Sequence, residues 1–326
     1  MSLNIMQSNT SNINNSFVNK DILSLDQFDQ KSIQTLFKTA ETIAAQMKKG
    51  KIFDLLTGKV INLLFFEPST RTFGSFVSAV KRLGGQTIEY QDPAETSSYV
   101  KGETLEDTTR VFECYSDMII IRHPEAGAAK RVADVVQVPV INGGDGPAEH
   151  PTQALYDMFT IYQKFGHLDN LVGVIGGDLL YGRTAHSLIK GLSIYKNNTF
   201  YLLAPKPLQL SDGMIRSFTK RGVKLIPIEN TEEIPTNAHF WYWTRVQKER
   251  FINGEDYEEI KNQFIITPKL AKEKGNKDMI IMHPLPRVGE IDPRLDSDPR
   301  AVYLPIQIKN GLYIRMALLA LIFGKM

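Results

Sequence analysis

Short apolar runs rich in β-branched and aromatic residues alternate with segments of helical periodicity from about residue 25 to the C-terminus. Runs that are apolar throughout are typical of strands buried on both faces of a parallel sheet, and the helical segments between them are typical of crossover connections. The alternation predicts an α/β fold of doubly wound, parallel sheets covered by helices on both faces. The expected strands span residues 60–66, 87–90, 118–122, 138–142, 171–176, 200–204, 223–228, 240–244 and 279–282.

The strands fall into two groups on either side of residues 151–165, where apolar residues recur at helical spacing after a proline that suits a first helical position. We interpret this segment as a helix that links two α/β domains. Residues 310–323 are apolar nearly all round, which is typical of a buried helix that could return to the first domain. We therefore expect a flexible tail (1–20), a first domain (21–150) completed by a C-terminal helix (308–326), and a second domain (151–307).

Composition narrows the class of protein. A chain of 326 residues, 42% hydrophobic and 23% charged, is long enough for two globular domains. A formal net charge of +2 is too small to indicate a nucleic-acid surface, and no apolar run reaches the roughly 18 residues of a membrane span. The only cysteine, Cys114, rules out an internal disulfide framework and fits the cytoplasm, and its apolar surroundings predict a small buried side chain. The Asn- and Ser-rich tail lacks the pattern of a secretory signal or a transit peptide.

The stretch "FFEPSTRTFGSF" (65–76) places hydroxyl and cationic groups directly after an apolar strand. Ser69 can cap the following helix, whose first N–H groups and positive dipole end favour an anion. Thr70 and Thr72 add hydroxyl donors, and Arg71 adds a planar fork that fits phosphate or carboxylate oxygens. An ordinary N-cap followed by an exposed arginine explains the same letters, so the motif alone leaves both interpretations open.

A second motif, "AEHPTQAL", places His150 just before the linking helix and Gln153 in its first turn. A helix N-terminus disfavours added positive charge, so such a histidine can stay neutral and donate a hydrogen bond to a polarised carbonyl oxygen. A histidine that merely caps the helix is the alternative. A metal site is not expected, because His123 and His283 stand on separate strands and nothing else lies at ligand spacing.

Further cationic groups fall where strands are expected to end. Arg122 closes "MIIIRHP", Arg183 opens a helix in "GGDLLYGRTAHS", and Arg245 closes "FWYWTR" with Gln247 nearby. Ligands of open α/β sheets bind at the carboxyl ends of strands, so these positions favour binding over simple solvation. The glycines of "VGVIGGDLL" lack the spacing of a dinucleotide fingerprint, and no acidic residue ends the next strand, so an NAD site is not expected.

From about residue 25 to the C-terminus the chain resembles the aspartate/ornithine carbamoyltransferase family. Markers of that family stand in sequence order as "FFEPSTRT", "KGETLEDT", "IRHPEAGAA", "NGGDGPAEHPTQAL", "GDLLYGRTAHSL", "TRVQKERF", "MHPLPRVGEI" and "NGLYIRMALLAL". The resemblance implies transfer of the carbamoyl group of carbamoyl phosphate to the amine of L-aspartate in pyrimidine synthesis, with no metal or bound cofactor. It also implies that the first domain binds carbamoyl phosphate and the second binds aspartate.

The resemblance assigns roles residue by residue. The catalytic residues implied are Arg71, Thr72, Lys101, Arg122 and His150. Carbamoyl phosphate would be bound by Ser69, Thr70, Arg71, Thr72, Ser97, Lys101, Arg122, His150, Gln153, Pro284 and Leu285, the prolyl and leucyl positions through backbone carbonyls or groups close to them. Aspartate would be bound by Lys101, Arg183, Arg245, Gln247, Leu285 and Pro286.

The resemblance further implies a homotrimer, because in this family the loop that carries Ser97 and Lys101 reaches into the neighbouring subunit's site. Regulatory or dihydroorotase chains could join such a trimer, and the sequence does not decide this. Three departures from the family pattern are Val100 and Leu180, where basic residues are common, and one extra residue near Pro305.

An ornithine or other amino-acid carbamoyltransferase is the alternative within the family. Ornithine carries a cationic side chain, so its site should not offer two arginines to the amino acid, and Pro284 stands where that branch has a cysteine. Aspartate is therefore the expected substrate. A non-catalytic carbamoyl phosphate-binding member is the alternative from a different class, and intact Thr72, Arg122, His150 and Arg245 argue against it.

Overall fold

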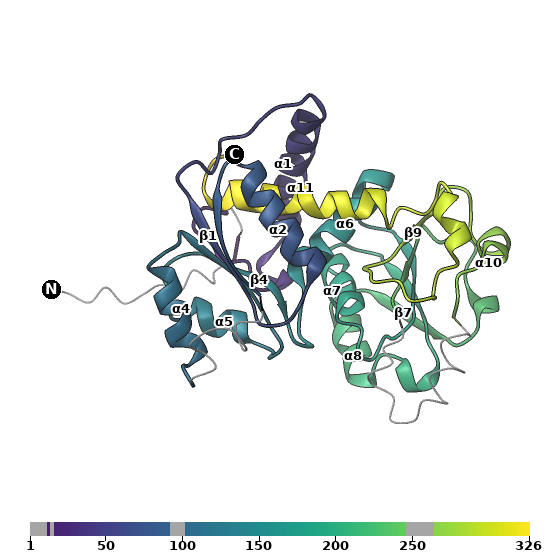
Figure 1. The fold of residues 1–326 in the computed structure, drawn as a ribbon. Coiled ribbons are helices and arrows are strands. Elements are labelled where there is room, and N and C mark those ends of the chain that lie inside the picture. Colours follow the sequence, from purple (N-terminus) through teal and green to yellow (C-terminus); the bar gives the residue numbers. More distant parts are fainter. Residues whose placement is uncertain (1–11, 14–15, 92–101, 246–263) are drawn as a thin grey trace. The chain divides into compact units, whose positions relative to one another are not determined.

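The chain forms two compact units, described here from a computed structural model that covers residues 12–13, 16–91, 102–245 and 264–326. The first unit comprises Met1–Thr152 and Gly311–Met326, and the second comprises Gln153–Asn310. The chain passes between the units inside two helices, α6 (Pro151–Phe165) and α11 (Pro305–Ile322) (Figure 1). The sequence analysis divided the chain after residues 150 and 307, and the two units divide after Thr152 and Asn310.

The first unit is built on a parallel four-stranded sheet in the order β2-β1-β3-β4. Side chains alternate along β1, so Leu64 faces the cluster covered by α4 and α5, whereas Phe65 stacks edge-on against Phe73 of α2 on the opposite face (Figure 1). Its elements are α1 (Gln30–Lys48), β1 (Val60–Phe65), α2 (Thr70–Arg82), β2 (Gln86–Gln91), α4 (Leu105–Glu113), β3 (Met118–His123), α5 (Ala128–Ala133) and β4 (Val140–Asp145), after the 3₁₀ turn η1 (Leu25–Gln27).

The second unit is built on a parallel five-stranded sheet in the order β7-β6-β5-β8-β9. Alternation along β8 again separates the faces: Trp241 and Trp243 join the core cluster that includes Ala271 of α10, and Tyr242 faces α6. Its elements are β5 (Val172–Gly176), α7 (Arg183–Leu192), β6 (Thr199–Leu203), η3 (Lys206–Leu208), α8 (Asp212–Lys220), β7 (Lys224–Ile228), η4 (Thr231–Glu233), β8 (Phe240–Trp243), α10 (Pro268–Glu273), β9 (Ile280–Met282) and η6 (Pro293–Ser297).

Each sheet has one point where the strand order reverses. In the first unit β1 connects outward to β2 and the chain then returns to β3 on the other side, so the reversal lies between β1 and β3. In the second unit the corresponding reversal lies between β5 and β8. Crevices at the carboxyl ends of such strand pairs are where open α/β sheets bind ligands. The predicted α/β class with parallel sheets is confirmed.

The C-terminal helix contributes to the first unit as predicted. Arg315 of α11 is buried, its Nη1 donates to the Ser75 hydroxyl of α2 at 2.8 Å, and its guanidinium lies over the Phe76 ring at 4.9 Å. Its Nη2 donates to the Thr152 hydroxyl at 3.4 Å. The charge of a buried arginine loses its water, and the hydroxyl acceptors and the aromatic ring offset this cost. Arg315 therefore fixes α2 against α11.

One local expectation was wrong, and a second was met only in part. Cys114 is exposed, because α4 buries the face that carries Leu105 and Phe112, and Cys114 stands at the C-cap on another side. Ser69 is the N-cap of α2, yet its side chain makes no capping hydrogen bond.

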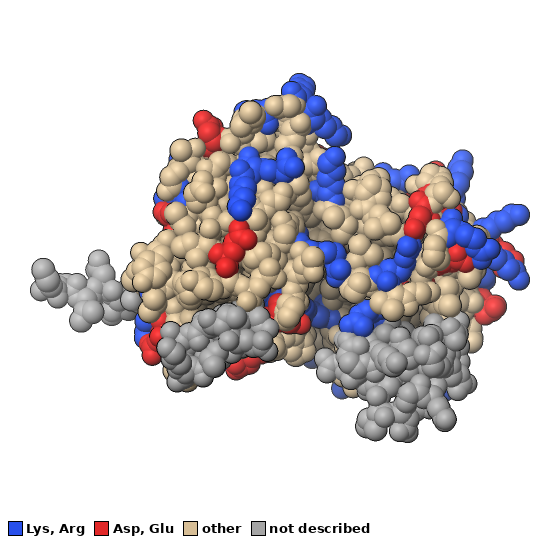
Figure 2. Space-filling view, in the orientation of Figure 1, with Lys and Arg blue, Asp and Glu red and all other residues tan. Residues whose placement is uncertain are grey.

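No helix among the described residues is both long and apolar enough to cross a membrane. Lys and Arg are scattered over many elements of the face drawn in Figure 2, so an anion site depends on local placement of such groups.

Candidate active site

The first group of predicted residues lies at the carboxyl edge of the first sheet, at its reversal point. The chain leaves β1 and begins α2 at Thr70, so the "STRT" residues stand at the start of a 13-residue helix. Thr70 and Arg71 are exposed, whereas Thr72 is only 6% exposed. The positive end of a helix and the exposed residue Arg71 therefore stand together here, an arrangement that suits a phosphate.

Thr72 contacts the second predicted motif. Its Oγ1 lies 3.2 Å from Nε2 of His150, a residue 78 positions away in the sequence, and both side chains are buried. His150 follows β4 and immediately precedes α6. A hydroxyl and an imidazole in contact form a pair of polar groups that can both address one ligand oxygen. The structure thus brings together the two motifs that the sequence could present only separately.

Arg122, near the end of β3, is held by one residue that follows β1 and by one residue of β4. Its Nη2 forms an ion pair with Glu67 Oε2 at 2.9 Å, and its Nη1 donates to the Gly143 carbonyl of β4 at 3.2 Å. The arginine side chain is 10% exposed, so the ion pair offsets the cost of burying its charge. Glu67 lies inside the "FFEPSTRT" motif and was missed at the sequence level, although its place four residues before Arg71 was a usable signal.

The second group of predicted residues follows three adjacent strands of the second sheet. Arg183 opens α7 after β5, Arg245 lies just beyond β8, and the segment 284–286 follows β9. The Thr244 N–H donates to the Gly176 carbonyl at 2.8 Å, which aligns the ends of β8 and β5. Gly177 has φ +108°, and an added Cβ there would lie 2.1 Å from the Thr244 carbonyl oxygen, so only glycine permits this close approach.

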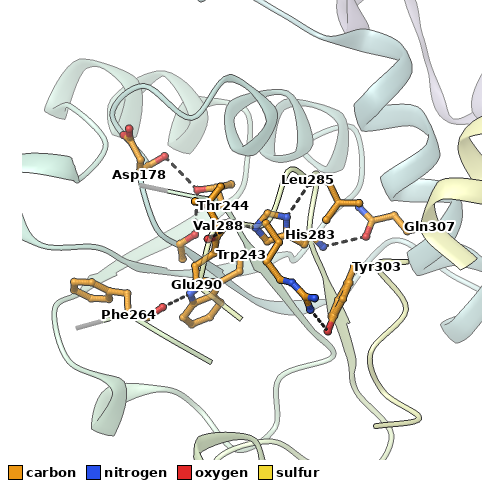
Figure 3. A network of polar contacts seen from close by, with 12 residues as sticks. Asp178, Trp243, Thr244, Phe264, His283, Leu285, Val288, Glu290, Tyr303 and Gln307 are labelled. Atoms are coloured by element: carbon orange, nitrogen blue, oxygen red, sulfur yellow. Dashed lines mark hydrogen bonds and ion pairs between the residues drawn. The ribbon is translucent and has the colours of Figure 1, made fainter. Parts of the chain in front are cut away.

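The segment after β9 is held in an unusual backbone conformation. Leu285 has φ +57°, a value rare for a residue with a side chain and frequent at functional sites. Its N–H donates to Nδ1 of His283 at 2.8 Å, so the ring proton stands on Nε2, which contacts Glu290 Oε1 at 2.8 Å (Figure 3). Burial acts to raise the pKa of Glu290, but the hydrogen bond and charge of His283, together with backbone N–H donors of the loop, outweigh burial and the pKa is lowered.

Gln153, in the first turn of α6, is oriented by its own helix. Its Nε2 donates to both carboxylate oxygens of Asp157, at 3.1 and 3.0 Å, and the Tyr156 hydroxyl donates to its Oε1. Asp157 also accepts from the Tyr242 hydroxyl at 2.8 Å, and burial together with this carboxylate raises the pKa of Tyr242. Asp157 was missed at the sequence level; its i+4 spacing from Gln153 was the available signal.

The outcome for the predicted residues differs by region. The structure places Ser69–Thr72 after β1 and Arg122 near the end of β3, the two strands at the reversal point of the first sheet, and it brings Thr72 into contact with His150. Ser97, Lys101 and Gln247, together with Val100, lie outside the described residues. Within the described ranges, no group of three or more His, Cys, Asp or Glu side chains could hold a metal ion.

Comparison with known families matches the chain in two consecutive parts. Residues 20–163 match "Aspartate/ornithine carbamoyltransferase, carbamoyl-P binding domain", and residues 169–322 match "Aspartate/ornithine carbamoyltransferase, Asp/Orn binding domain". These two matches divide between the two sheets.

Individual relatives resemble the chain over nearly all its length. It is 44% identical to the aspartate carbamoyltransferase catalytic subunit of Methanosarcina barkeri over 95% of this chain and 99% of that protein. It is also 44% identical to the multifunctional protein pyr1-3 of Dictyostelium discoideum, of whose length it spans only 14%. A solved structure of aspartate transcarbamoylase from Trypanosoma cruzi in complex with carbamoyl phosphate and aspartate is 36% identical, with a TM-score of 0.85 and coverage of 93% of this chain and 97% of that one.

Proposed function

Because the chain belongs to the aspartate/ornithine carbamoyltransferase family, we propose that it is an aspartate carbamoyltransferase. It transfers the carbamoyl group of carbamoyl phosphate to the amine of L-aspartate and yields N-carbamoyl-L-aspartate and phosphate, a step of pyrimidine biosynthesis. The observation that carries this proposal is the contact between Thr72 and His150 at the reversal point of the first sheet, next in sequence to the exposed Arg71 of the "STRT" helix start.

Carbamoyl phosphate is bound mainly by groups of the first unit. Ser69, Thr70, Arg71 and Thr72 hold the phosphate at the helix start, where N–H groups and the guanidinium neutralise its charge. Thr72, Arg122 and His150 donate to the carbonyl oxygen. Gln153 and the carbonyls of Pro284 and Leu285 receive the carbamoyl N–H groups.

Binding of aspartate is the task of the second unit. Arg183 and Arg245, together with Gln247 two residues after Arg245, take the two carboxylates, and Leu285 and Pro286 adjoin the amino group. Two guanidinium groups match a dicarboxylate and would repel the cationic side chain of ornithine, which favours aspartate over the alternative within the family.

The reaction then proceeds through attack of the neutral aspartate amine on the carbamoyl carbon. The new C–N bond forms while negative charge builds on the carbonyl oxygen, where Thr72, Arg122 and His150 stabilise it. The C–O bond to phosphate breaks next, and the departing phosphate takes the amine proton. Holding both substrates together supplies much of the remaining acceleration, since it converts a bimolecular step into a unimolecular one.

We further propose a homotrimer with shared active sites, in which Ser97 and Lys101 act on the neighbouring chain's substrate, and a cytoplasmic location. Regulatory or dihydroorotase partners are part of this proposal, since relatives include multifunctional proteins of much greater length.

The deciding experiment supplies the purified chain with carbamoyl phosphate and either aspartate or ornithine, and identifies the carbamoylated product by mass spectrometry. We expect N-carbamoyl-aspartate in large excess. Citrulline as the main product, or no carbamoylated product from either amino acid, would overturn the proposal.

A further inference from the structure

A single buried carboxylate lies at the centre of a hydrogen-bond network in the second unit. Asp157 of α6 is 0% exposed and accepts from Nε2 of Gln153, from the Tyr242 hydroxyl at 2.8 Å, and from Nε2 of Gln307 at 2.7 Å. A buried carboxylate is tolerated when several donors replace its lost water, and these donors come from three different elements. The network is therefore a built feature of this fold.

The carboxylate fixes the orientation of two amides. A carboxylate only accepts hydrogen bonds, so Gln153 and Gln307 must each turn the NH₂ end toward Asp157. Each glutamine consequently presents its carbonyl oxygen on the other side. For Gln153 that oxygen accepts from Tyr156 and has a second lone pair; for Gln307 it accepts from the backbone N–H of His283 at 3.0 Å.

The second amide anchors the segment that follows β9. His283 is held through its backbone by Gln307, and through its ring by Leu285 and Glu290, as the close-up shows (Figure 3). The Val288 N–H donates to the other carboxylate oxygen of Glu290 at 2.8 Å, which closes the loop on itself. The carbonyls of Pro284 and Leu285 are thus presented by a loop whose starting point depends on Gln307.

We infer that Asp157 is a positioning residue for recognition of the carbamoyl NH₂ group. It turns the Gln153 oxygen away from the carboxylate, where it can act as an acceptor, and through Gln307 it holds the loop that presents the Pro284 and Leu285 carbonyls. All of these groups are acceptors, and the chemical group that they match is an amide NH₂. The inference rests on the proposed function, and it adds the residue that makes these groups face the ligand as hydrogen-bond acceptors.

The test compares carbamoyl phosphate with acetyl phosphate, which carries a methyl group in place of the NH₂ and is measured as a competitive inhibitor. Asp157→Asn keeps the shape but can donate, so either glutamine can reverse. We expect the KM for carbamoyl phosphate to rise about 10- to 100-fold, because the acceptors that Asp157 orients toward the NH₂ group are lost. The inhibition constant for acetyl phosphate should change less than about threefold. Tyr242→Phe is the matched control, because it removes one donor to Asp157 and leaves both amides oriented; its discrimination should equal that of the wild type.

The outcomes separate this inference from the proposed function. Failure of the wild-type chain to carbamoylate aspartate refutes the proposed function. Equal weakening of both phosphates, or unchanged discrimination, in a folded and active Asp157→Asn chain overturns the inference alone. Should that chain not fold, Gln307→Leu decides, since it releases the His283 backbone and removes one donor to Asp157 while Gln153 stays oriented. Wild-type discrimination in a folded Gln307→Leu chain then overturns the inference.

Discussion

Replacement of Thr72 by valine isolates the contact that joins the two motifs of the first unit. Valine keeps the shape of threonine and removes the hydroxyl, so packing at this buried position is retained while the 3.2 Å contact with His150 Nε2 is lost. Loss of one hydrogen bond of this kind costs about 1 kcal/mol of stability. The fold should therefore tolerate the change.

The effect on catalysis should be much larger. If Thr72 helps to stabilise the developing oxyanion, its removal lowers kcat by about 10²–10³-fold, equivalent to about 2.7–4 kcal/mol of transition-state stabilisation. The KM for carbamoyl phosphate should change less than about tenfold, because the phosphate keeps the helix start and Arg71, and an interaction made chiefly in the transition state appears in kcat.

Steady-state kinetics and urea unfolding on the same preparations test this. Thr109→Val is the matched control: Thr109 is also fully buried, and its hydroxyl donates to the Leu105 and Glu106 carbonyls inside α4. That variant should lose similar stability and keep kcat. A folded Thr72→Val chain with kcat within about twofold of the wild type would refute the assigned role, whatever its KM.

Three further predictions concern other regions. Arg71→Ala should nearly abolish turnover, and mixing it with Lys101→Ala chains should restore some activity, because a shared site draws the two residues from different chains; verified mixed trimers without recovery would argue against sharing. Burial raises the pKa of Asp21 to about 6, so the folded chain keeps a proton that the unfolded chain releases, and the free energy of unfolding falls as pH rises from about 4 to about 6. Asp21→Asn should remove this fall and stabilise the chain by up to about 3 kcal/mol at pH 8. An unchanged pH slope in urea unfolding would contradict this prediction. For Glu290 the pH dependence of stability has the opposite sign, because its pKa is lowered: its charge stabilises the fold above the usual Glu pKa, and the effect is lost as pH falls through the folded value. Glu290→Gln should therefore destabilise the chain most near pH 7 and little in strong acid. An equal loss of stability at both pH values would count against the ion pair with His283.

Local patterns in the sequence were enough for the elements and for the candidate chemistry. Strand and helix formation depends on periodicity over a few residues, so the apolar runs predicted β1 to β9 closely and the Pro151 segment predicted α6. The order of motifs was likewise readable along the chain. The placement of Arg122 and Arg245 at strand ends likewise followed from the cationic residues that close apolar runs.

Tertiary structure decided which side chains meet and which stay exposed. Thr72 and His150 are 78 positions apart, and only the strand order of the first sheet brings them to 3.2 Å. Cys114 sits among apolar letters but lies outside the face that α4 buries, which depends on how that helix is rotated against its neighbours. The orientation of the Gln153 amide depends on the Asp157 carboxylate, which also accepts hydrogen bonds from residues of distant elements. Periodicity acts over neighbouring residues, whereas these contacts depend on the packing register between elements, which no single stretch of sequence encodes.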